Sequence, residues 1–218
     1  MRSKEFWQYF NSDVKPLLAA RADTFEQMFV HLDQFDRPVG IIETGCTREA
    51  GNWAGDGCST LLFDTYAKHH VGSKIYTVDL DPEATALCQQ LVSTNVSVHT
   101  GDSVGYLKSL ADKPPADMPY LDLLYLDSYD VDFHNPTLSA IHHLKELVAV
   151  IPLIRSETLV VVDDSPLSII AYSNEGKFAL VEPPSIGGKG KFVAEYAEQI
   201  GATKQFSSYQ CGWTRMRG

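Results

Sequence analysis

The chain alternates short apolar runs with longer amphipathic runs, and this alternation constrains the fold more than any other feature. The apolar runs are rich in Val, Ile, Leu and Tyr, and most are apolar on both faces. Strands have this character when helices cover both sides of a parallel sheet. The sequence therefore predicts five such strands, at residues 38–43, 74–79, 95–102, 121–127 and 158–164.

Helix-like segments separate the predicted strands. Pro82 and Glu83 open the second of them, as helix starts prefer, and Asp102 is a good N-cap for the third. Alternation of strand and helix implies right-handed crossovers and a doubly wound α/β sheet. The predicted helices cover residues 58–70, 82–92, 103–111 and 137–151.

The two ends of the chain differ from this core. The segment before Pro38 is predicted to be helical and to cover the sheet or close the site. Residues 165–190 contain Pro, Ser and Gly and predict a long excursion, with a short strand at 178–183. A helix over 187–201 and a final pair of strands complete the chain. We expect one domain over 1–218, with a helical cap (1–36), a cofactor-binding core (38–164) and the excursion.

Length and charge limit the classes of partner and function that the chain can have. The 218 residues fit one domain, and a net charge of -10 makes nucleic acid and anionic membranes poor partners. No apolar run approaches the roughly 20 residues that span a bilayer. The four cysteines form no CxxC pair, so free thiols are expected. We therefore expect a cytoplasmic protein with a small-molecule substrate, and a homodimer is compatible with the sequence.

Four of the five predicted strands end in a carboxylate. In an open parallel sheet, the carboxyl ends of the strands line the crevice where ligands bind. Capping of the following helix explains any one of these acids. Clustered like charges are costly without compensation, however, so their joint position favours a site that holds cations or hydrogen-bond donors. The acids are Glu43, Asp79, Asp127 and Asp163, the last followed by Asp164.

Two acids suit a nucleoside. Asp79 can accept hydrogen bonds from both ribose hydroxyls, whereas Asp81 more simply caps the next helix. Asp102 and Ser103, after the third strand, can bracket an adenine, although a capping role for Asp102 is equally compatible.

The first loop argues against a dinucleotide. The sequence has ETGC at 43–46 and GDGCST at 55–60, so the G-x-G-x-x-G fingerprint is absent. Glu43 and Asp56 would repel a pyrophosphate but suit an amino group and a sulfonium. The loop also supplies Gly45 and Gly57, and the helix start at Ser59 and Thr60 can receive a carboxylate. Together these groups describe S-adenosylmethionine.

The motifs IIETGC, YTVDLDPEA, HTGDS, LDLLYLDSYDVD and TLVVVDDS resemble class I S-adenosylmethionine-dependent methyltransferases over residues 38–164. The resemblance is greatest to metal-dependent small-molecule O-methyltransferases of the catechol, macrocin and cephamycin kind. It implies a Rossmann-like, mostly parallel seven-stranded sheet of order 3-2-1-4-5-7-6, with an antiparallel C-terminal strand. It also implies O-methylation of a small hydroxylated metabolite.

The same resemblance implies a divalent ion such as Mg²⁺, held by Asp127, Asp163 and Asp164. Three oxygen ligands would leave open positions for water and substrate, and a coordinated hydroxyl is a better nucleophile. The alternative is a metal-free site in which Asp127 only orients cofactor or substrate.

The sequence offers two candidates for the residue that accepts the proton. Asp130 falls where relatives place a base, although they often carry Lys or His there. His134 is the alternative, because histidine titrates near neutrality. His142 and His143 lie on a predicted helix and are interpreted as packing or surface residues.

Two further segments allow two interpretations each. The long loop 46–56, with Arg48, Asn52 and Trp53, either folds over the ligands or is a surface loop. Lys189 and Lys191 either receive an anionic substrate group or lie on a flexible loop.

Three competing functions follow from the same features. A metal-independent N- or O-methyltransferase differs from the leading prediction in its response to Mg²⁺ or Mn²⁺. A nucleotide-binding oxidoreductase conflicts with the missing dinucleotide fingerprint. A non-catalytic Rossmann module that binds a nucleotide would lack turnover.

Overall fold

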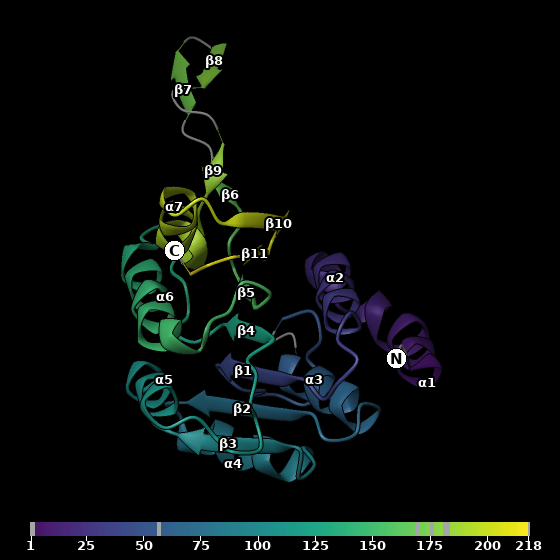
Figure 1. The fold of residues 1–218 in the computed structure, drawn as a ribbon. Helices are drawn as coiled ribbons and strands as arrows, with labels where there is room; N and C mark the ends of the chain where they lie inside the picture. Colours follow the sequence, from purple (N-terminus) through teal and green to yellow (C-terminus); the bar gives the residue numbers. More distant parts are fainter. Residues whose placement is uncertain (1–2, 56–57, 169–170, 175–176, 181–183, 218) are drawn as a thin grey trace.

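A computed structural model of the chain shows a seven-stranded sheet with helices on both faces (Figure 1). It describes residues 3–55, 58–168, 171–174, 177–180 and 184–217. The strands of the sheet are β1 (Gly40–Thr44), β2 (Lys74–Asp79), β3 (Val96–Thr100), β4 (Leu123–Leu126), β5 (Leu159–Val162), β10 (Thr203–Ser207) and β11 (Cys211–Thr214).

The strand order is β3-β2-β1-β4-β5-β11-β10. The first five strands pair in parallel, whereas β11 runs antiparallel to both β5 and β10. This confirms the predicted Rossmann-like α/β sheet, including its order and its antiparallel C-terminal strand.

The register places the predicted acids at one edge of the sheet. Thr44 of β1 pairs with Val78 of β2 and with Leu126 of β4, and Leu126 pairs in turn with Val162 of β5. The next residue of each strand therefore lies at the same edge. These next residues are Gly45, Asp79, Asp127 and Asp163.

Helices form a layer on each side of the sheet. The helices are α1 (Lys4–Tyr9), α2 (Ala22–Leu32), α3 (Ser59–Lys68), α4 (Pro82–Leu91), α5 (Ser103–Asp112), α6 (Thr137–Val150) and α7 (Lys191–Gln199). Figure 1 shows α1, α2 and α3 on one side and α5, α6 and α7 on the other. The predicted capping by Asp81 and Asp102 is present, because their carboxylates accept hydrogen bonds from Glu83 N and Gly105 N.

Alternation along the strands divides the core into two clusters. Leu159 and Val161 of β5 face α2 and α3, whereas Val160 and Val162 face α6 and α7. Period-two alternation then directs the next side chain, Asp163, to the α2 side.

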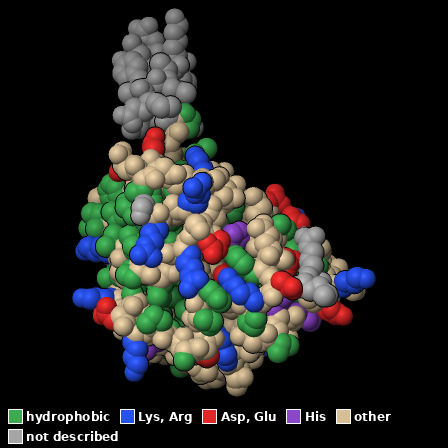
Figure 2. All heavy atoms as spheres, viewed as in Figure 1, with side chains coloured by type: hydrophobic (Ala, Val, Ile, Leu, Met, Phe, Trp, Pro, Cys, Tyr) green, Lys and Arg blue, Asp and Glu red, His purple; other side chains and the backbone are tan. Residues whose placement is uncertain are grey.

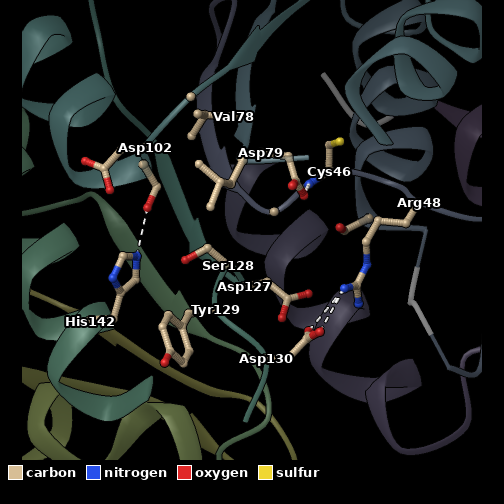
Figure 3. Close-up of a pocket in the computed structure, with 15 residues that line it drawn as sticks. Cys46, Arg48, Val78, Asp79, Asp102, Asp127, Ser128, Tyr129, Asp130 and His142 are labelled. Atoms are coloured by element: carbon tan, nitrogen blue, oxygen red, sulfur yellow. Dashed lines mark hydrogen bonds and ion pairs between the residues drawn. The ribbon is translucent and has the colours of Figure 1, made fainter. Parts of the chain in front are cut away.

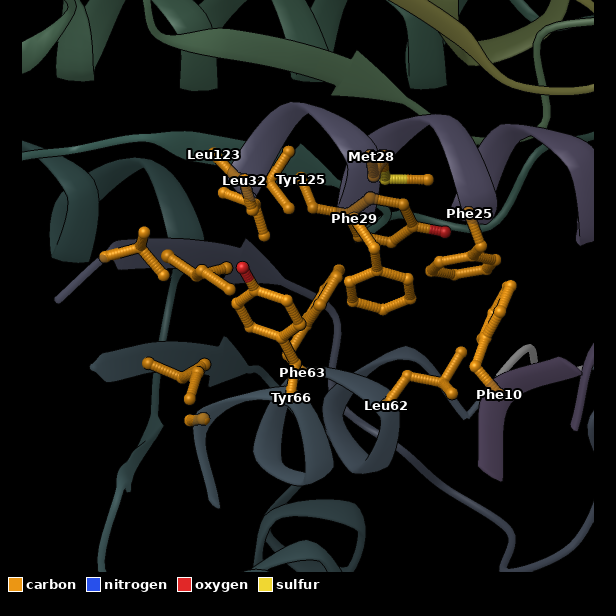
Figure 4. Close-up of a cluster of buried hydrophobic side chains, with 14 of the residues drawn as sticks. Phe10, Phe25, Met28, Phe29, Leu32, Leu62, Phe63, Tyr66, Leu123 and Tyr125 are labelled. Carbon is orange, nitrogen blue, oxygen red and sulfur yellow. The ribbon is translucent and has the colours of Figure 1, made fainter. Parts of the chain in front are cut away.

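The N-terminal segment, which includes α1 and α2, packs into the hydrophobic core on the α2 and α3 side of the sheet. Between α1 and α2 the chain continues through one π turn and two 3-10 turns. Figure 4 shows Phe25 and Phe29 of α2 packed against Phe63 of α3 and Tyr125 of β4. Each buried side chain of this size contributes about 1.5–3 kcal/mol. Burial of this kind fixes α2, and with it the residue just before the helix, relative to the strand ends.

A β-rich segment follows β5 and extends away from the sheet (Figure 1). Its short strands are β6 (Leu167–Ser168), β7 (Ala171–Asn174), β8 (Lys177–Leu180) and β9 (Ser185–Ile186). β6 pairs with β9, and β7 pairs with β8, both antiparallel. The predicted strand at 178–183 overlaps β8, and residues 181–183 lie outside the described residues.

Charged and hydrophobic side chains are interspersed on the face of the molecule that Figure 2 shows. Lys and Arg side chains on the face in Figure 2 are dispersed among hydrophobic ones instead of forming one basic patch. Within the part of the chain that the structure describes, every helix is too short or too polar to cross a bilayer.

Candidate functional site

A pocket of about 210 Å³ opens at the carboxyl ends of β1, β2 and β4. Figure 3 shows Asp79 beside Cys46 on one side of it, Asp102 and His142 on the other, and Asp127 with Ser128 between them. Its lining consists of Gly45, Cys46, Arg48, Ser59, Val78, Asp79, Leu80, Gly101, Asp102, Ser103, Asp127, Ser128, Tyr129, Asp130 and His142.

Seven of the predicted site residues meet at this pocket. They are Gly45, Ser59, Asp79, Asp102, Ser103, Asp127 and Asp130. Glu43 and Thr60 are buried beneath it, while Asp163 and Asp164 lie beyond its lining. Gly57 and Asp56 lie outside the described residues.

Asp79 is held rigidly at the pocket wall. Its Oδ2 accepts a hydrogen bond of 3.1 Å from Cys46 N, and its Oδ1 accepts one of 2.9 Å from Asp81 N. Two backbone donors thus fix the carboxylate, and its remaining lone pairs can accept from vicinal hydroxyls in the pocket.

The opposite wall is stabilised by a network on α6. His142 Nε2 lies 2.9 Å from Ser103 Oγ and 3.4 Å from Glu146 Oε1. Glu146 also accepts hydrogen bonds from Ser128 Oγ at 2.6 Å and Thr44 Oγ1 at 3.2 Å. Burial raises the pKa of Glu146, but its histidine neighbours and hydroxyl donors outweigh burial and leave that pKa below its ordinary value.

His142 is therefore a wall residue of the pocket, although its place in the helical pattern predicts packing or surface exposure. His143, one residue on, is fully buried, and burial lowers its pKa to about 4. The helical spacing alone gives no signal that separates these two neighbours. Only the packing of α6 against the sheet directs one toward the pocket and the other into the core.

Gly45 allows β1 and β4 to approach each other at the pocket. Its φ is +82°, and a Cβ there would lie 2.5 Å from the carbonyl oxygen of Asp127. A side chain at this position would therefore displace the backbone that presents Asp127.

We expect Gly45→Ala to be worse than Gly51→Ala, the matched control. Gly51 has a similar φ of +84°, but a Cβ there meets nothing within 4 Å. The control should lose about 1–2 kcal/mol from left-handed strain alone, and Gly45→Ala about 1–3 kcal/mol more from overpacking. Urea denaturation and calorimetric titration with S-adenosylhomocysteine check this. Equal losses in both variants would show that the contact with Asp127 is unimportant.

Glu43 is fully buried at the end of β1. Its Oε2 accepts a 2.6 Å hydrogen bond from Thr60 Oγ1, whereas Oε1 has no hydrogen-bond partner among the residues that the structure describes. Burial is the main reason that the pKa of Glu43 rises to about 7, despite hydrogen bonds from neighbouring hydroxyls. The Thr60 side chain thus positions Glu43, and the receipt of a ligand carboxylate at the helix start of Ser59 and Thr60 stays a prediction.

This burial predicts a pH dependence of stability. The folded chain keeps the Glu43 proton up to a pKa of about 7, while the unfolded chain loses it near the ordinary value of 4.5. Stability is therefore lost as the pH rises between these values, by up to about 3 kcal/mol. Glu43→Gln should lose less stability than the parent protein between pH 5 and pH 8 in urea denaturation. The exposed control Glu83→Gln should follow the parent, and an equal decline in Glu43→Gln would contradict the assignment.

The three predicted metal ligands do lie together, but two cationic side chains fill the space between them. Lys189 Nζ lies 2.6 Å from Asp127 Oδ1 and 3.1 Å from Asp164 Oδ2. Arg21 Nε lies 2.7 Å from Asp163 Oδ2, and Arg21 Nη2 lies 3.1 Å from Asp164 Oδ1. Over the described part of the chain, no group of three or more Asp, Glu, His or Cys residues is arranged to hold a metal ion.

The charges in this cluster stabilise one another. Burial opposes ionisation of Arg21 and Lys189, but attraction to the aspartates outweighs it and raises the pKa of both cations. The pKa of Asp164 is lowered, because Lys189 and its hydrogen-bond donors outweigh burial. For Asp127, burial outweighs the attraction of Lys189 and raises the pKa well above its ordinary value.

Lys189 and Arg21 are placed where no sequence pattern predicts them. Lys189 is only 1 % exposed, so it is neither on a solvated loop nor available to an anionic substrate. Arg21 carried no signal in the sequence, because it belongs to a segment without a motif.

The two candidates for the proton acceptor are placed differently. Asp130 lines the pocket, where its carboxylate pairs with Arg48 Nη1 at 3.0 Å. His134 is exposed and is not among the pocket-lining residues, and its backbone N–H donates to Asp132 Oδ1. Arg48 comes from the long loop after β1, so this loop does reach the pocket, as one of its two interpretations held.

The fold and the pocket define a class of protein, a Rossmann-like domain with a pocket at the carboxyl ends of its strands, where ligands bind in open α/β sheets. Comparison with known families narrows this class. A family described as "Methyltransferase domain" matches residues 49–165, more than half of the chain. The chain therefore belongs to that family, and it is an S-adenosylmethionine-dependent methyltransferase. A search of curated proteins finds no significant match.

Among the solved structures to which the chain is similar, CalS11 supports the fold. The calicheamicin methyltransferase CalS11 has a TM-score of 0.58 at 12% identity, covering 99% of this chain and 94% of that one. The mycinamycin-pathway methyltransferase MycE, solved with Mg and S-adenosylhomocysteine, has a TM-score of 0.48 at 16% identity. Its match covers 74% of this chain but only 36% of MycE. The N-methyltransferase NodS from Bradyrhizobium japonicum has a TM-score of 0.48 at 10% identity, covering 90% and 96%.

Proposed function

We propose that this methyltransferase transfers the methyl group of S-adenosylmethionine to a hydroxyl group of a small molecule in the pocket at the strand ends. The observation that carries the proposal is the convergence of Asp79, Asp102 and Asp127 on one pocket beside the tight Gly45 turn. Carboxylates placed this way suit a ligand with donor hydroxyls, an amino group and a positive charge.

The residues present fit this cofactor in three regions of the pocket. Asp79, fixed by two backbone donors, would accept from the ribose hydroxyls. Asp102 and Ser103 would bracket the adenine, and His142 contacts the Ser103 hydroxyl. Gly45 and Ser59 would lie along the amino-acid end, above the buried Glu43.

The chain's own residues must position the acceptor and take up a proton. The cofactor supplies an electrophilic methyl group on a sulfonium, and no metal-dependent step is needed for its transfer. Asp127 would orient the reacting groups from the end of β4, which favours transfer by alignment. Asp130, exposed at the pocket, is the proposed proton acceptor, and Arg48 would hold its carboxylate in place.

Two measurements test the proposal. Calorimetric titration should show S-adenosylmethionine binding to the purified chain in a one-to-one complex. Incubation with S-adenosylmethionine and a panel of hydroxylated and amino small molecules should then release S-adenosylhomocysteine with a subset of the hydroxylated ones. Turnover only with amines would replace O-methylation by N-methylation, and the absence of binding would contradict the pocket assignment.

A further inference from the structure

We propose that Lys189 and Arg21 take the place of a divalent ion, so that this enzyme transfers methyl groups without a metal. The inference rests on the proposed function for the role of the pocket, but its evidence is the ion-pair cluster of Asp127, Asp163 and Asp164 behind the pocket. These carboxylates match the positions at which the resemblance implied metal ligands. Each of these carboxylates already contacts a cation of the chain itself.

The ammonium group of Lys189 occupies the centre between two of these carboxylates. It lies 2.6 Å from Asp127 Oδ1, 3.3 Å from Asp127 O and 3.1 Å from Asp164 Oδ2. The backbone seats it there, because Lys189 N donates to Asp164 O at 3.0 Å. Gly188 permits the close approach, since a Cβ at its φ of +55° would lie within van der Waals overlap of Asp164 O.

Arg21 closes the cluster from the opposite side. Besides its two aspartate contacts, its Nη1 donates to Ala54 O at 3.1 Å, and its guanidinium lies 4.7 Å from the centre of the Tyr209 ring. Both oxygens of Asp163 are engaged, because its Oδ2 also accepts from Tyr125 Oη at 2.7 Å and its Oδ1 accepts from Asp164 N at 2.7 Å. A metal would therefore have to displace several short hydrogen bonds to reach Asp163.

The charges of the cluster also disfavour a divalent ion. The cluster already holds two cations against its three aspartates, and burial disfavours the ionised form of Asp127. A divalent ion added to this cluster would lie beside a buried ammonium and a buried guanidinium, which is costly at low dielectric.

The test measures metal binding directly and needs no acceptor. Mn²⁺ is titrated into the wild-type chain and followed by electron paramagnetic resonance, and S-adenosylmethionine binding is measured by calorimetry with and without EDTA. We expect no stoichiometric Mn²⁺ site, and cofactor affinities that agree within about twofold. A one-to-one Mn²⁺ site that Asp163→Asn removes, or a cofactor affinity that falls more than about tenfold in EDTA, would overturn the inference.

A gain-of-binding variant sharpens the test. Lys189→Met removes the ammonium while keeping a similar length, and leaves the three carboxylates with only one cation. This variant should acquire a Mn²⁺ site at least about tenfold tighter than any in the wild type. The double variant Lys189→Met/Asp163→Asn is the matched control and should lose it again. If the single variant folds and acquires no such site, Lys189 does not stand in for the metal.

The two proposals fail in different ways. Lack of S-adenosylmethionine binding under every condition would contradict the proposed function. The Mn²⁺ titration of the wild type would still test whether the cluster holds a metal. Should Lys189→Met not fold, the wild-type titration still decides between a metal-free and a metal-bound cluster.

Discussion

Arg21→Ala is expected to destabilise the protein by about 3–5 kcal/mol, the cost of leaving a buried charge without its partner. Arg21 Nε lies 2.7 Å from Asp163 Oδ2, and the two side chains are only 7% and 1% exposed. Without the guanidinium, Asp163 keeps the hydrogen bond from Tyr125 but loses its cation. Because domains of this size have total stabilities of about 5–15 kcal/mol, the effect should be plain in urea denaturation at neutral pH.

An exposed ion pair of the same N-terminal segment provides the control. Lys15 Nζ lies 2.7 Å from Glu26 Oε2, but the two side chains are 28% and 38% exposed. Lys15→Ala should therefore cost no more than about 1 kcal/mol. A loss in Arg21→Ala as small as in this control would mean that the N-terminal segment does not neutralise the cluster.

Asp79→Ala is expected to weaken binding of S-adenosylhomocysteine by about 100-fold or more. Charge-assisted hydrogen bonds contribute about 1.5–3 kcal/mol each, and this carboxylate is proposed to accept two from the ribose. Its orientation is set by Cys46 N and Asp81 N, so the variant also releases two backbone donors. Calorimetric titration of the purified variant measures the change directly.

Asp81→Ala separates the ligand role from the structural one. Asp81 is exposed and caps α4 through a 2.8 Å hydrogen bond from Glu83 N. Its removal should cost about 1 kcal/mol of stability without a large change in affinity. If instead Asp81→Ala weakens binding as much as Asp79→Ala, the two acids have been assigned the wrong way round.

Much of the fold could be predicted from the sequence, because strands and helix caps depend on local sequence patterns. Apolar runs of strand length gave five parallel strands, and Asp81 and Asp102 cap α4 and α5 as their positions in the sequence predict. The convergence of Asp79 and Asp127 on one pocket also follows from the sequence, because parallel strands end at a common edge.

The partners of the acids were decided only by the tertiary structure. Arg21 is 142 residues from Asp163, and Lys189 is 62 residues from Asp127, so no local pattern links them. His142 and His143 are equivalent in the helical pattern, yet one lines the pocket and the other is buried. The sequence by itself determined that carboxylates gather at the edge of the sheet, because strand ends and register are local properties. Which charges neutralise them depends on the packing of the N-terminal segment and of the turn before α7, and packing between distant segments has no local signature.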